Sequence, residues 1–248
     1  MQLKKFTLLA LTCAISIPAF AADHPETLTN EYGLQSFSGP EIFGRKKCNK
    51  DDLIDAKASV ERGVDGDTVM VKASDGGSYS VRMMGIDTPE THYLGHSQGE
   101  WGEKAGERLR EILPAGTKVR LEFSDEGCDK YGRVLAFVWK GKLNVNAQMA
   151  KEGLAVSYCV GPNVTHCEEI GKNVNEAVEN RLGMFSDSDV ELPYDFRHRI
   201  SNREWTYFVG NIQTNQVFRP GNNEQVPVGD RVFFFKKKDI EAPFFLAD

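Results

Sequence analysis

The sequence lacks a long apolar run beyond its first residues, so we expect no membrane-spanning helix and no stable membrane association. The start of the chain is apolar but too short to cross a bilayer. Lys4 and Lys5 precede this stretch, and Ala19-Phe20-Ala21 has the small residues of a cleavage site. We therefore interpret residues 1–21 as a signal peptide and expect an exported protein, either periplasmic or secreted.

The chain also lacks an excess of basic residues. It has 30 Lys and Arg against 36 Asp and Glu, a formal net charge of −6, and two of the lysines lie in the expected signal peptide. This balance argues against a broad basic face for nucleic acid. An enzyme acting on nucleic acid with this composition must concentrate its positive charge locally.

Cysteine is scarce, and no Cys-x-x-Cys pair is present, which disfavours a zinc-thiolate site. Apart from Cys13 in the signal peptide, four cysteines remain, and an even number in an exported chain favours disulfides. Three pairings are possible. We favour Cys48–Cys128 together with Cys159–Cys167.

Hydrophobic periodicity divides the chain into an N-terminal extension at 22–55, a central domain at 56–186 and a C-terminal extension at 187–248. The extension at 22–55 is polar and interrupted by Pro and Gly. The central pattern predicts strands at 58–60, 68–71, 79–84, 118–123 and 134–139, and helices at 99–113, 144–153 and 165–182. Five strands with a helix between the third and fourth match an OB-type barrel, an α+β fold that is mainly β and has three helices.

The last 60 residues are rich in aromatic side chains, which should be buried. Strand patterns occur at 205–209, 216–218 and 231–235, separated by Gly-Asn turns. We expect a small β-rich appendage packed on the barrel.

The first candidate site is built from two short motifs, Asp65-Gly66-Asp67-Thr68 and Ile86-Asp87-Thr88-Pro89-Glu90. Asp67 and Asp87 lie at the ends of neighbouring expected strands and can converge. Two carboxylates and the Thr88 carbonyl form a sparse set of hard oxygen ligands, which suits Ca²⁺. Glu90 can face the same cavity as a general base, and Arg82 can bind phosphate oxygens with its planar fork.

A second candidate cluster is Asp129-Lys130-Tyr131-Gly132-Arg133. An aromatic ring beside cations suits a nucleotide, because the ring can stack on the base while the charges meet the phosphate. Each motif alone is common in turns and surface loops. Their joint order and spacing therefore carry the interpretation as a phosphodiesterase site.

In this arrangement residues 56–186 resemble the staphylococcal nuclease family. The resemblance rests on Val64-Asp65-Gly66-Asp67-Thr68-Val69, Ile86-Asp87-Thr88-Pro89-Glu90-Thr91, Asp129-Lys130-Tyr131-Gly132-Arg133 and Gly161-Pro162-Asn163. It implies an OB-fold barrel and a calcium-dependent endonuclease that hydrolyses DNA and RNA to leave 3′-phosphate ends.

The resemblance also assigns roles to individual residues. It implies calcium ligands at Asp67, Asp87 and the Thr88 carbonyl, a general base at Glu90, phosphate-binding arginines at Arg82 and Arg133, and nucleotide-binding residues at Lys130, Tyr131 and Tyr158. The chain departs from the family pattern at Val160, where a second pocket tyrosine is expected. It also departs at residues 92–96, which replace a basic loop.

Two other functions remain open from the sequence. A non-catalytic OB-fold module would bind nucleic acid without cleaving it, although such a module would be expected to lose some of the acids or arginines. A transition-metal hydrolase would use His92 and His96, but Gly95 between them makes a helical pair doubtful, and exposed loop histidines are the simpler explanation. We expect a monomer with DNA and RNA as its substrates.

Overall fold

The computed structural model describes residues 47–48 and 56–247, with the backbone alone at 124–126. The expected signal peptide lies outside the described residues, as does nearly all of the N-terminal extension. No helix in the described part is both long enough and apolar enough to cross a membrane.

The central domain contains eight strands and three α-helices in the described range. Their bounds are β1 Lys57–Gly63, β2 Thr68–Ala73, β3 Ser78–Met83, β4 Gly85–Asp87, α1 Glu100–Ile112, β5 Lys118–Cys128, β6 Val134–Lys140, β7 Leu143–Asn144, α2 Val145–Lys151, β8 Val156–Val160 and α3 Cys167–Glu179. The predicted strands and helices are all present, with shifted ends.

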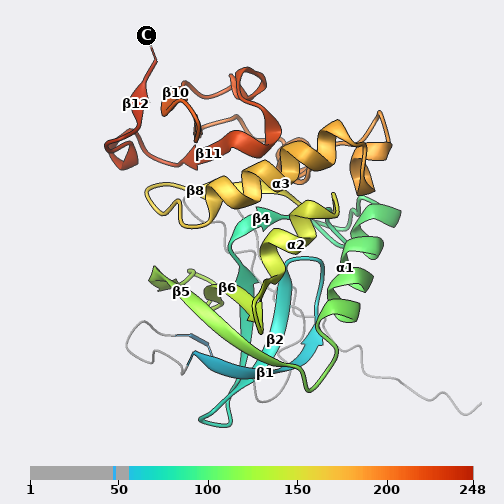
Figure 1. The fold of residues 1–248 in the computed structure, drawn as a ribbon. Coiled ribbons are helices and arrows are strands. Elements are labelled where there is room, and N and C mark those ends of the chain that lie inside the picture. The colour runs from blue at the N-terminus through green and yellow to red at the C-terminus, as the bar shows by residue number, and fades with distance from the viewer. Residues whose placement is uncertain (1–46, 49–55, 248) are drawn as a thin grey trace, which may run out of the picture.

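Strands β1, β2, β3, β5 and β6 form a closed five-stranded barrel (Figure 1). The sheet runs β3-β2-β1-β5-β6, and parallel pairing of β3 with β6 closes it, with Val81 opposite Val134. Alternating apolar residues turn inward, as Val69, Val71 and Val81 do, and these three are fully buried. The OB-type barrel and its three helices are confirmed.

The C-terminal extension adds α4 Pro193–Ser201, β9 Phe208–Asn211, β10 Gln216–Phe218, β11 Arg231–Phe234 and β12 Phe245–Leu246. The expected strands at 216–218 and 231–235 are confirmed, whereas the strand expected at 205–209 begins only at Phe208. The helix α4 was not predicted. Its only buried residues are Pro193, Tyr194 and Phe196, too few to give a clear helical period.

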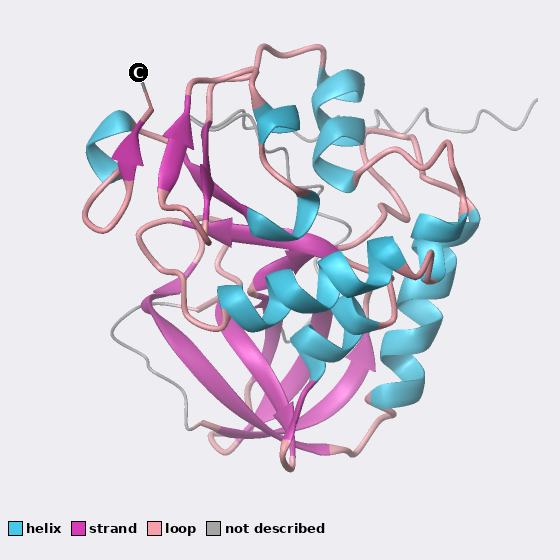
Figure 2. Ribbon diagram, turned by 45° about the horizontal axis from the view of Figure 1, so that its top comes forward, coloured by secondary structure: helices cyan, strands magenta, loops and turns pink. Residues whose placement is uncertain are grey.

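The extension continues a sheet that begins in the central domain. This second sheet runs β12-β10-β9-β11-β8-β4, and β11 pairs in parallel with β8, with Phe233 opposite Val160. In both ribbon views β8 and α3 lie between the barrel strands and the C-terminal strands (Figures 1 and 2). The appendage is therefore joined to the barrel domain by backbone hydrogen bonds as well as by packing.

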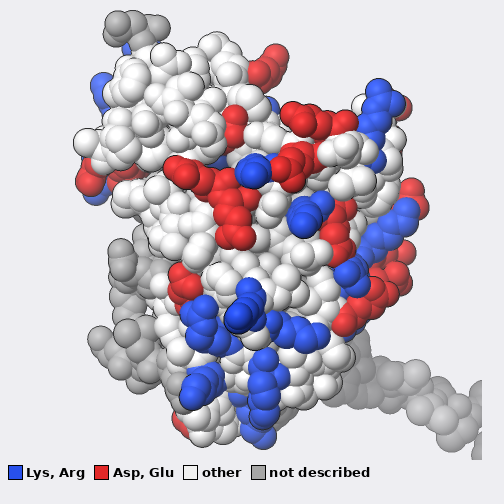
Figure 3. Space-filling view, in the orientation of Figure 1, with Lys and Arg blue, Asp and Glu red and all other residues white. Residues whose placement is uncertain are grey.

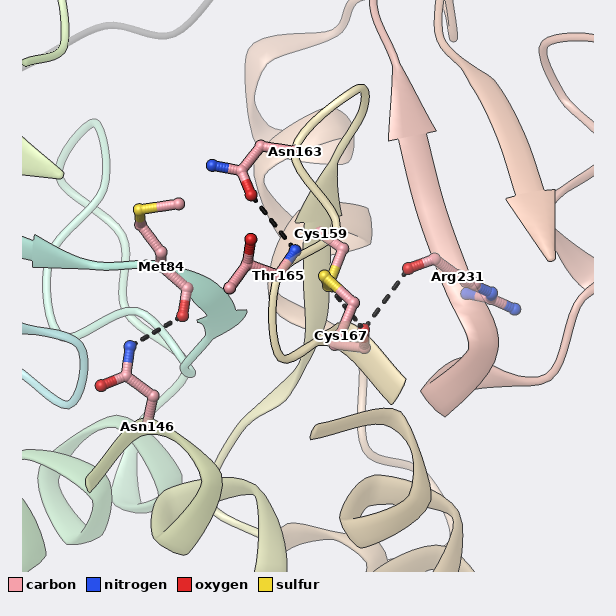
Figure 4. The surroundings of a disulfide bond; sticks show 8 residues. Met84, Asn146, Cys159, Asn163, Thr165, Cys167 and Arg231 are labelled. Atoms are coloured by element: carbon pink, nitrogen blue, oxygen red, sulfur yellow. Dashed lines mark hydrogen bonds between the residues drawn. A yellow bond between two sulfur atoms is a disulfide. The ribbon is translucent and has the colours of Figure 1, made fainter. Parts of the chain in front are cut away.

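Both favoured disulfides are present. Cys48 pairs with Cys128 across 80 residues, and Cys159 pairs with Cys167 across 8 residues. The second bridge links the end of β8 to the start of α3, next to β11 (Figure 4). Ser157 on β8 donates a hydrogen bond to the Arg231 carbonyl at 3.4 Å, so the bridge lies where the two parts of the chain meet.

Candidate active site

The turn between β1 and β2 brings the two acidic motifs together. Asp67 lies just before β2 and contacts the second motif. Its carboxylate oxygen Oδ2 accepts hydrogen bonds from the backbone N–H and the hydroxyl of Thr88, at 3.1 and 3.2 Å. The turn must pass very close to Thr88, because a Cβ at Gly66 would lie 2.7 Å from the Thr88 hydroxyl oxygen. Only glycine fits there. The sequence thus fixes Asp67 against the residue that follows Asp87.

Arg82 on β3 bridges the two aspartates. Its guanidinium lies 2.6 Å from Asp67 Oδ2 and 3.1 Å from Asp87 Oδ1. The pairing of β2 with β3 sets this contact, since Thr68 is the partner of Arg82 in the ladder. Asp87 ends β4 and is 1% exposed. Its charge is therefore buried, and buried charges require partners.

A second arginine meets the same carboxylates from the C-terminal extension. Arg197 on α4 places Nη2 2.6 Å from Asp87 Oδ2 and Nη1 2.6 Å from Glu90 Oε1. The result is an alternating chain of charges in the order Asp67, Arg82, Asp87, Arg197, Glu90. The sequence motifs gave no indication of Arg197, since it lies 110 residues from Asp87.

A weak signal for this helix does exist in the sequence. Pro193 stands at the first helical position and Asp195 in the first turn, both typical of a helix start. This signal predicts the start of α4 but not that the Arg197 side chain contacts Asp87 and Glu90.

Burial and neighbouring charges shift several pKa values in the site. Burial, together with the adjacent Asp67 charge, raises the pKa of Asp65 to about 7. Burial also raises the pKa of Glu90, although the Arg197 charge opposes this. Burial alone would lower the pKa of Arg82, but Asp67 and Asp87 outweigh it and the net direction is upward. Burial is the first cause of the shifts at both acids, so these carboxyl groups lie in a site with little solvent.

The second sequence cluster lies on the loop before β6. The Asp129 carboxylate accepts hydrogen bonds from the backbone N–H groups of Tyr131 and Arg133, each at 2.9 Å. Arg133 Nε lies 2.6 Å from the same carboxylate. The Tyr131 ring lies 5.5 Å from both the Lys130 ammonium and the Arg133 guanidinium. Arg133 thus pairs with Asp129 and not with the carboxylates of the first cluster, although β6 neighbours β3.

Tyr158 lies nearer to the acidic cluster. The Arg197 guanidinium is 5.7 Å from its ring centre, and burial raises the pKa of its hydroxyl. A pocket beside it is lined by Tyr93, Tyr158, Tyr194, Arg197, His198, Ser201, Arg203 and Tyr207. Most of this lining comes from the C-terminal extension. Val160, where the family pattern has a second tyrosine, pairs with Phe233 of β11.

The histidine alternative gains no support from the structure. His92 and His96 are exposed on a tight loop closed by backbone hydrogen bonds between Tyr93 and His96. Within the described ranges, no three His, Cys, Asp or Glu side chains are placed to hold a metal ion together. A cation at the acidic site would therefore depend on two carboxylates, backbone oxygen and water.

Positive charge is concentrated on the barrel. Figure 3 shows Lys and Arg side chains gathered over the lower part of the molecule, where the barrel strands lie, while acidic side chains gather above. Exposed basic residues of these strands include Lys57, Lys118, Arg120 and Lys140. Basic charge is therefore concentrated locally on the barrel although the net charge of the chain is −6.

The barrel and its buried acid–arginine cluster define a class, that of the nuclease-type hydrolases. Comparison with known proteins supports this class. A family profile described as staphylococcal nuclease homologue matches residues 80–187. The thermonuclease of Staphylococcus hyicus is 38% identical over 128 residues, which cover 52% of this chain and 75% of that protein. The thermonuclease of Staphylococcus intermedius is 35% identical over 142 residues, covering 57% and 83% of the two chains.

The chain belongs to the staphylococcal nuclease family. A longer match extends beyond the family profile: endonuclease YhcR of Bacillus subtilis (strain 168) is 28% identical over 193 residues, which cover 74% of this chain. That match spans only 16% of YhcR. This chain therefore matches one segment of YhcR and not its whole length.

Proposed function

We propose that this protein is a calcium-dependent endonuclease that hydrolyses phosphodiester bonds of DNA and RNA and leaves 3′-phosphate ends. The observation that carries the proposal is the buried contact of Arg82 with both Asp67 and Asp87. Acids from two separate motifs meet one planar guanidinium there, beside a further carboxylate at Glu90. This combination supplies groups for phosphate binding and for proton transfer in one place.

The donor set fits a hard cation. Asp67 and Asp87 contribute carboxylates and Thr88 its carbonyl, all oxygen ligands of the kind Ca²⁺ prefers. Three carboxylates here face two guanidiniums, so the cluster keeps an excess of negative charge that a cation would offset. When bound, the cation would neutralise the charge of the scissile phosphate.

The side chains of the site divide the chemical work between them. Glu90 accepts a proton from water, whose oxygen attacks phosphorus in line with the leaving 5′-oxygen. The bond from phosphorus to the 5′-oxygen breaks, the 5′-oxygen takes up a proton from solvent to become a hydroxyl, and the phosphate stays on the 3′-oxygen. Arg82 stabilises the charge on the equatorial oxygens. We assign the same role to Arg133, which must leave Asp129 to reach the phosphate.

We assign nucleotide binding to two aromatic residues, Tyr131 in the second cluster and Tyr158 beside Arg197. The Tyr131 ring lies 5.5 Å from each of two cations, and Tyr158 lines the pocket next to Arg197. Stacking on such rings is tolerant of sequence, which suits an enzyme acting on both DNA and RNA. Lys130 adds charge for a neighbouring phosphate.

The two disulfides support a site of action outside the cytosol, because disulfides persist in oxidising compartments. We propose that the protein is exported, to a periplasm or to the medium, and that it acts as a monomer.

Cleavage of single-stranded and duplex DNA by the full chain, with Ca²⁺ and then with EGTA, tests the proposal. We expect cleavage that EGTA abolishes, and products whose 5′-hydroxyl ends accept phosphate from a polynucleotide kinase without prior phosphatase treatment. Cleavage that persists in EGTA would contradict the metal dependence. Binding of the oligonucleotide without cleavage would favour the non-catalytic binding module instead.

A further inference from the structure

The C-terminal extension enters the acidic site through one side chain, Arg197. Its guanidinium contacts both oxygens of Asp87, at 2.9 and 2.6 Å, and Glu90 Oε1 at 2.6 Å. The Arg197 side chain is 12% exposed. An arginine this buried and this well paired has little freedom to take other positions, so its contacts define where the two carboxylates lie.

Contacts with the C-terminal extension hold both the side chain and the backbone of Glu90. Among the described residues, Arg197 is the side chain that holds its carboxylate. Its backbone is tied as well: the Glu90 N–H donates to Gln98 Oε1 at 3.0 Å, and Gln98 Nε2 donates to the Glu191 carbonyl at 2.7 Å. Glu191 and Arg197 both belong to the extension. Two independent contacts therefore anchor the Glu90 segment to residues beyond the barrel domain.

The helix that carries Arg197 is itself held firmly. Tyr194 on α4 is buried, and its hydroxyl accepts a hydrogen bond from Arg231 Nη1 at 2.6 Å. The Tyr194 ring packs on Phe233 with ring centres 5.2 Å apart. Both partners lie on β11, which pairs with β8, and β8 pairs with the strand that ends in Asp87. One continuous sheet thus fixes the helix relative to the site.

We propose that Arg197 is a positioning residue that holds the Glu90 carboxylate beside Asp87, so that the C-terminal extension completes the active site. This inference rests on the proposed nuclease function. Glu90 follows a proline in a loop, and without the guanidinium its carboxylate would lose the side-chain contact that holds it among the described residues. A general base must lie within about 3 Å of the proton that it removes, and a displacement of about 1 Å can slow a reaction about 100-fold.

Kinetics of Arg197→Gln, Arg197→Lys and a matched control, Arg199→Gln, test the proposal. Arg199 lies two residues away on the same helix, is 59% exposed and pairs with the Glu191 carboxylate. The contact with Gln98 uses the Glu191 backbone carbonyl instead, so the control leaves that contact in place. We expect Arg197→Gln to lower kcat roughly 10- to 100-fold with KM for an oligonucleotide nearly unchanged. The kcat of Arg197→Lys should lie between those of Arg197→Gln and wild type, because lysine keeps the positive charge but not the planar guanidinium. The kcat and KM of Arg199→Gln should match those of wild type.

Other outcomes would overturn the proposal. A rise in KM alone would make Arg197 a substrate ligand, and a rise in kcat would make it an inhibitory arm. Unchanged kinetics in Arg197→Gln would remove it from the site. Each variant's thermal midpoint shows whether a loss of activity is a loss of fold, and Arg197→Lys carries the test if Arg197→Gln unfolds.

A double-mutant cycle separates this inference from the proposed function. Denaturant midpoints of Glu90→Gln, Arg197→Gln and the double variant report the interaction whether or not the protein cleaves DNA. We expect shifts that are clearly non-additive. An inactive wild type would refute the nuclease function, whereas additive shifts would refute the role of Arg197.

Discussion

The barrel domain and the C-terminal extension contribute to the site in different ways. The barrel supplies Asp67, Arg82, Asp87 and Glu90 from stretches that lie close in sequence. The extension supplies Arg197, which is 107 residues beyond Glu90. Local turns and strand pairing determine the positions of the four barrel side chains. The position of Arg197 depends on the whole second sheet, against which its helix packs. A segment outside the barrel thus contributes a side chain to the site that the barrel motifs form.

The two regions also differ in how they are packed. The barrel has its own core, formed by residues such as Val69, Val81 and Leu121. The extension is built around two smaller clusters that include residues of β8, namely Val156 with Phe233, and Cys159 with Phe234. Since these clusters need residues from both regions, we expect the extension and the barrel to unfold together.

The largest effect on activity is expected from replacing Glu90, the proposed general base. Glu90→Gln removes the group that accepts the proton, and a positioned general base contributes about 100- to 10,000-fold. We expect kcat to fall by a factor in this range. The control is Glu100→Gln on α1, whose side chain is 68% exposed and pairs with Lys104. Near-normal turnover by Glu90→Gln would remove Glu90 from the base role.

The next effect tests whether the two regions form one unit. Phe233 is fully buried on β11, and Phe233→Ala should lower the free energy of unfolding by roughly 3–5 kcal/mol through lost burial and a cavity. Phe245→Ala is the matched control, since Phe245 is 51% exposed. Denaturant unfolding followed by fluorescence and by circular dichroism should give one coincident transition. Two separated transitions would show that the extension folds by itself.

A smaller effect concerns the disulfide at the junction. Replacing Cys159 and Cys167 with Ala opens a loop of 8 residues, and its closure entropy corresponds to about 2.5 kcal/mol of unfolding free energy. Denaturant midpoints under oxidising conditions measure this loss. Under reducing conditions wild type and variant both lack the bridge, so their difference should largely disappear. A difference that persists with reductant would mean that packing, rather than the bridge, causes the loss.

Much of the barrel could be predicted because its signals are local. Alternating strands, turn residues and the Asp-Gly-Asp turn all act over a few residues, and Gly66 allows the approach to Thr88 that joins the two motifs. The favoured disulfide pairing was also confirmed. The contact between Asp67 and Asp87 through Arg82 follows from strand order once the barrel is recognised.

The remainder depends on contacts that no local pattern encodes. Helix α4 buries few apolar residues, and the direction of Arg197 is decided by the sheet that runs from β4 to β11. The ion pair of Arg133 with Asp129 was not predicted either, although their spacing of four residues permits it. Sequence reasoning therefore identified the acids and missed one of their two buried partners.

A crystal structure of the full chain with Ca²⁺ and a deoxynucleoside 3′-phosphate, the predicted product, tests the central claim most directly. We predict a cation bound by Asp67, Asp87 and the Thr88 carbonyl, the phosphate on Arg82, and Arg197 still in contact with Glu90. A cation bound elsewhere, or a phosphate away from Arg82, would contradict the assignment of this cluster as the active site.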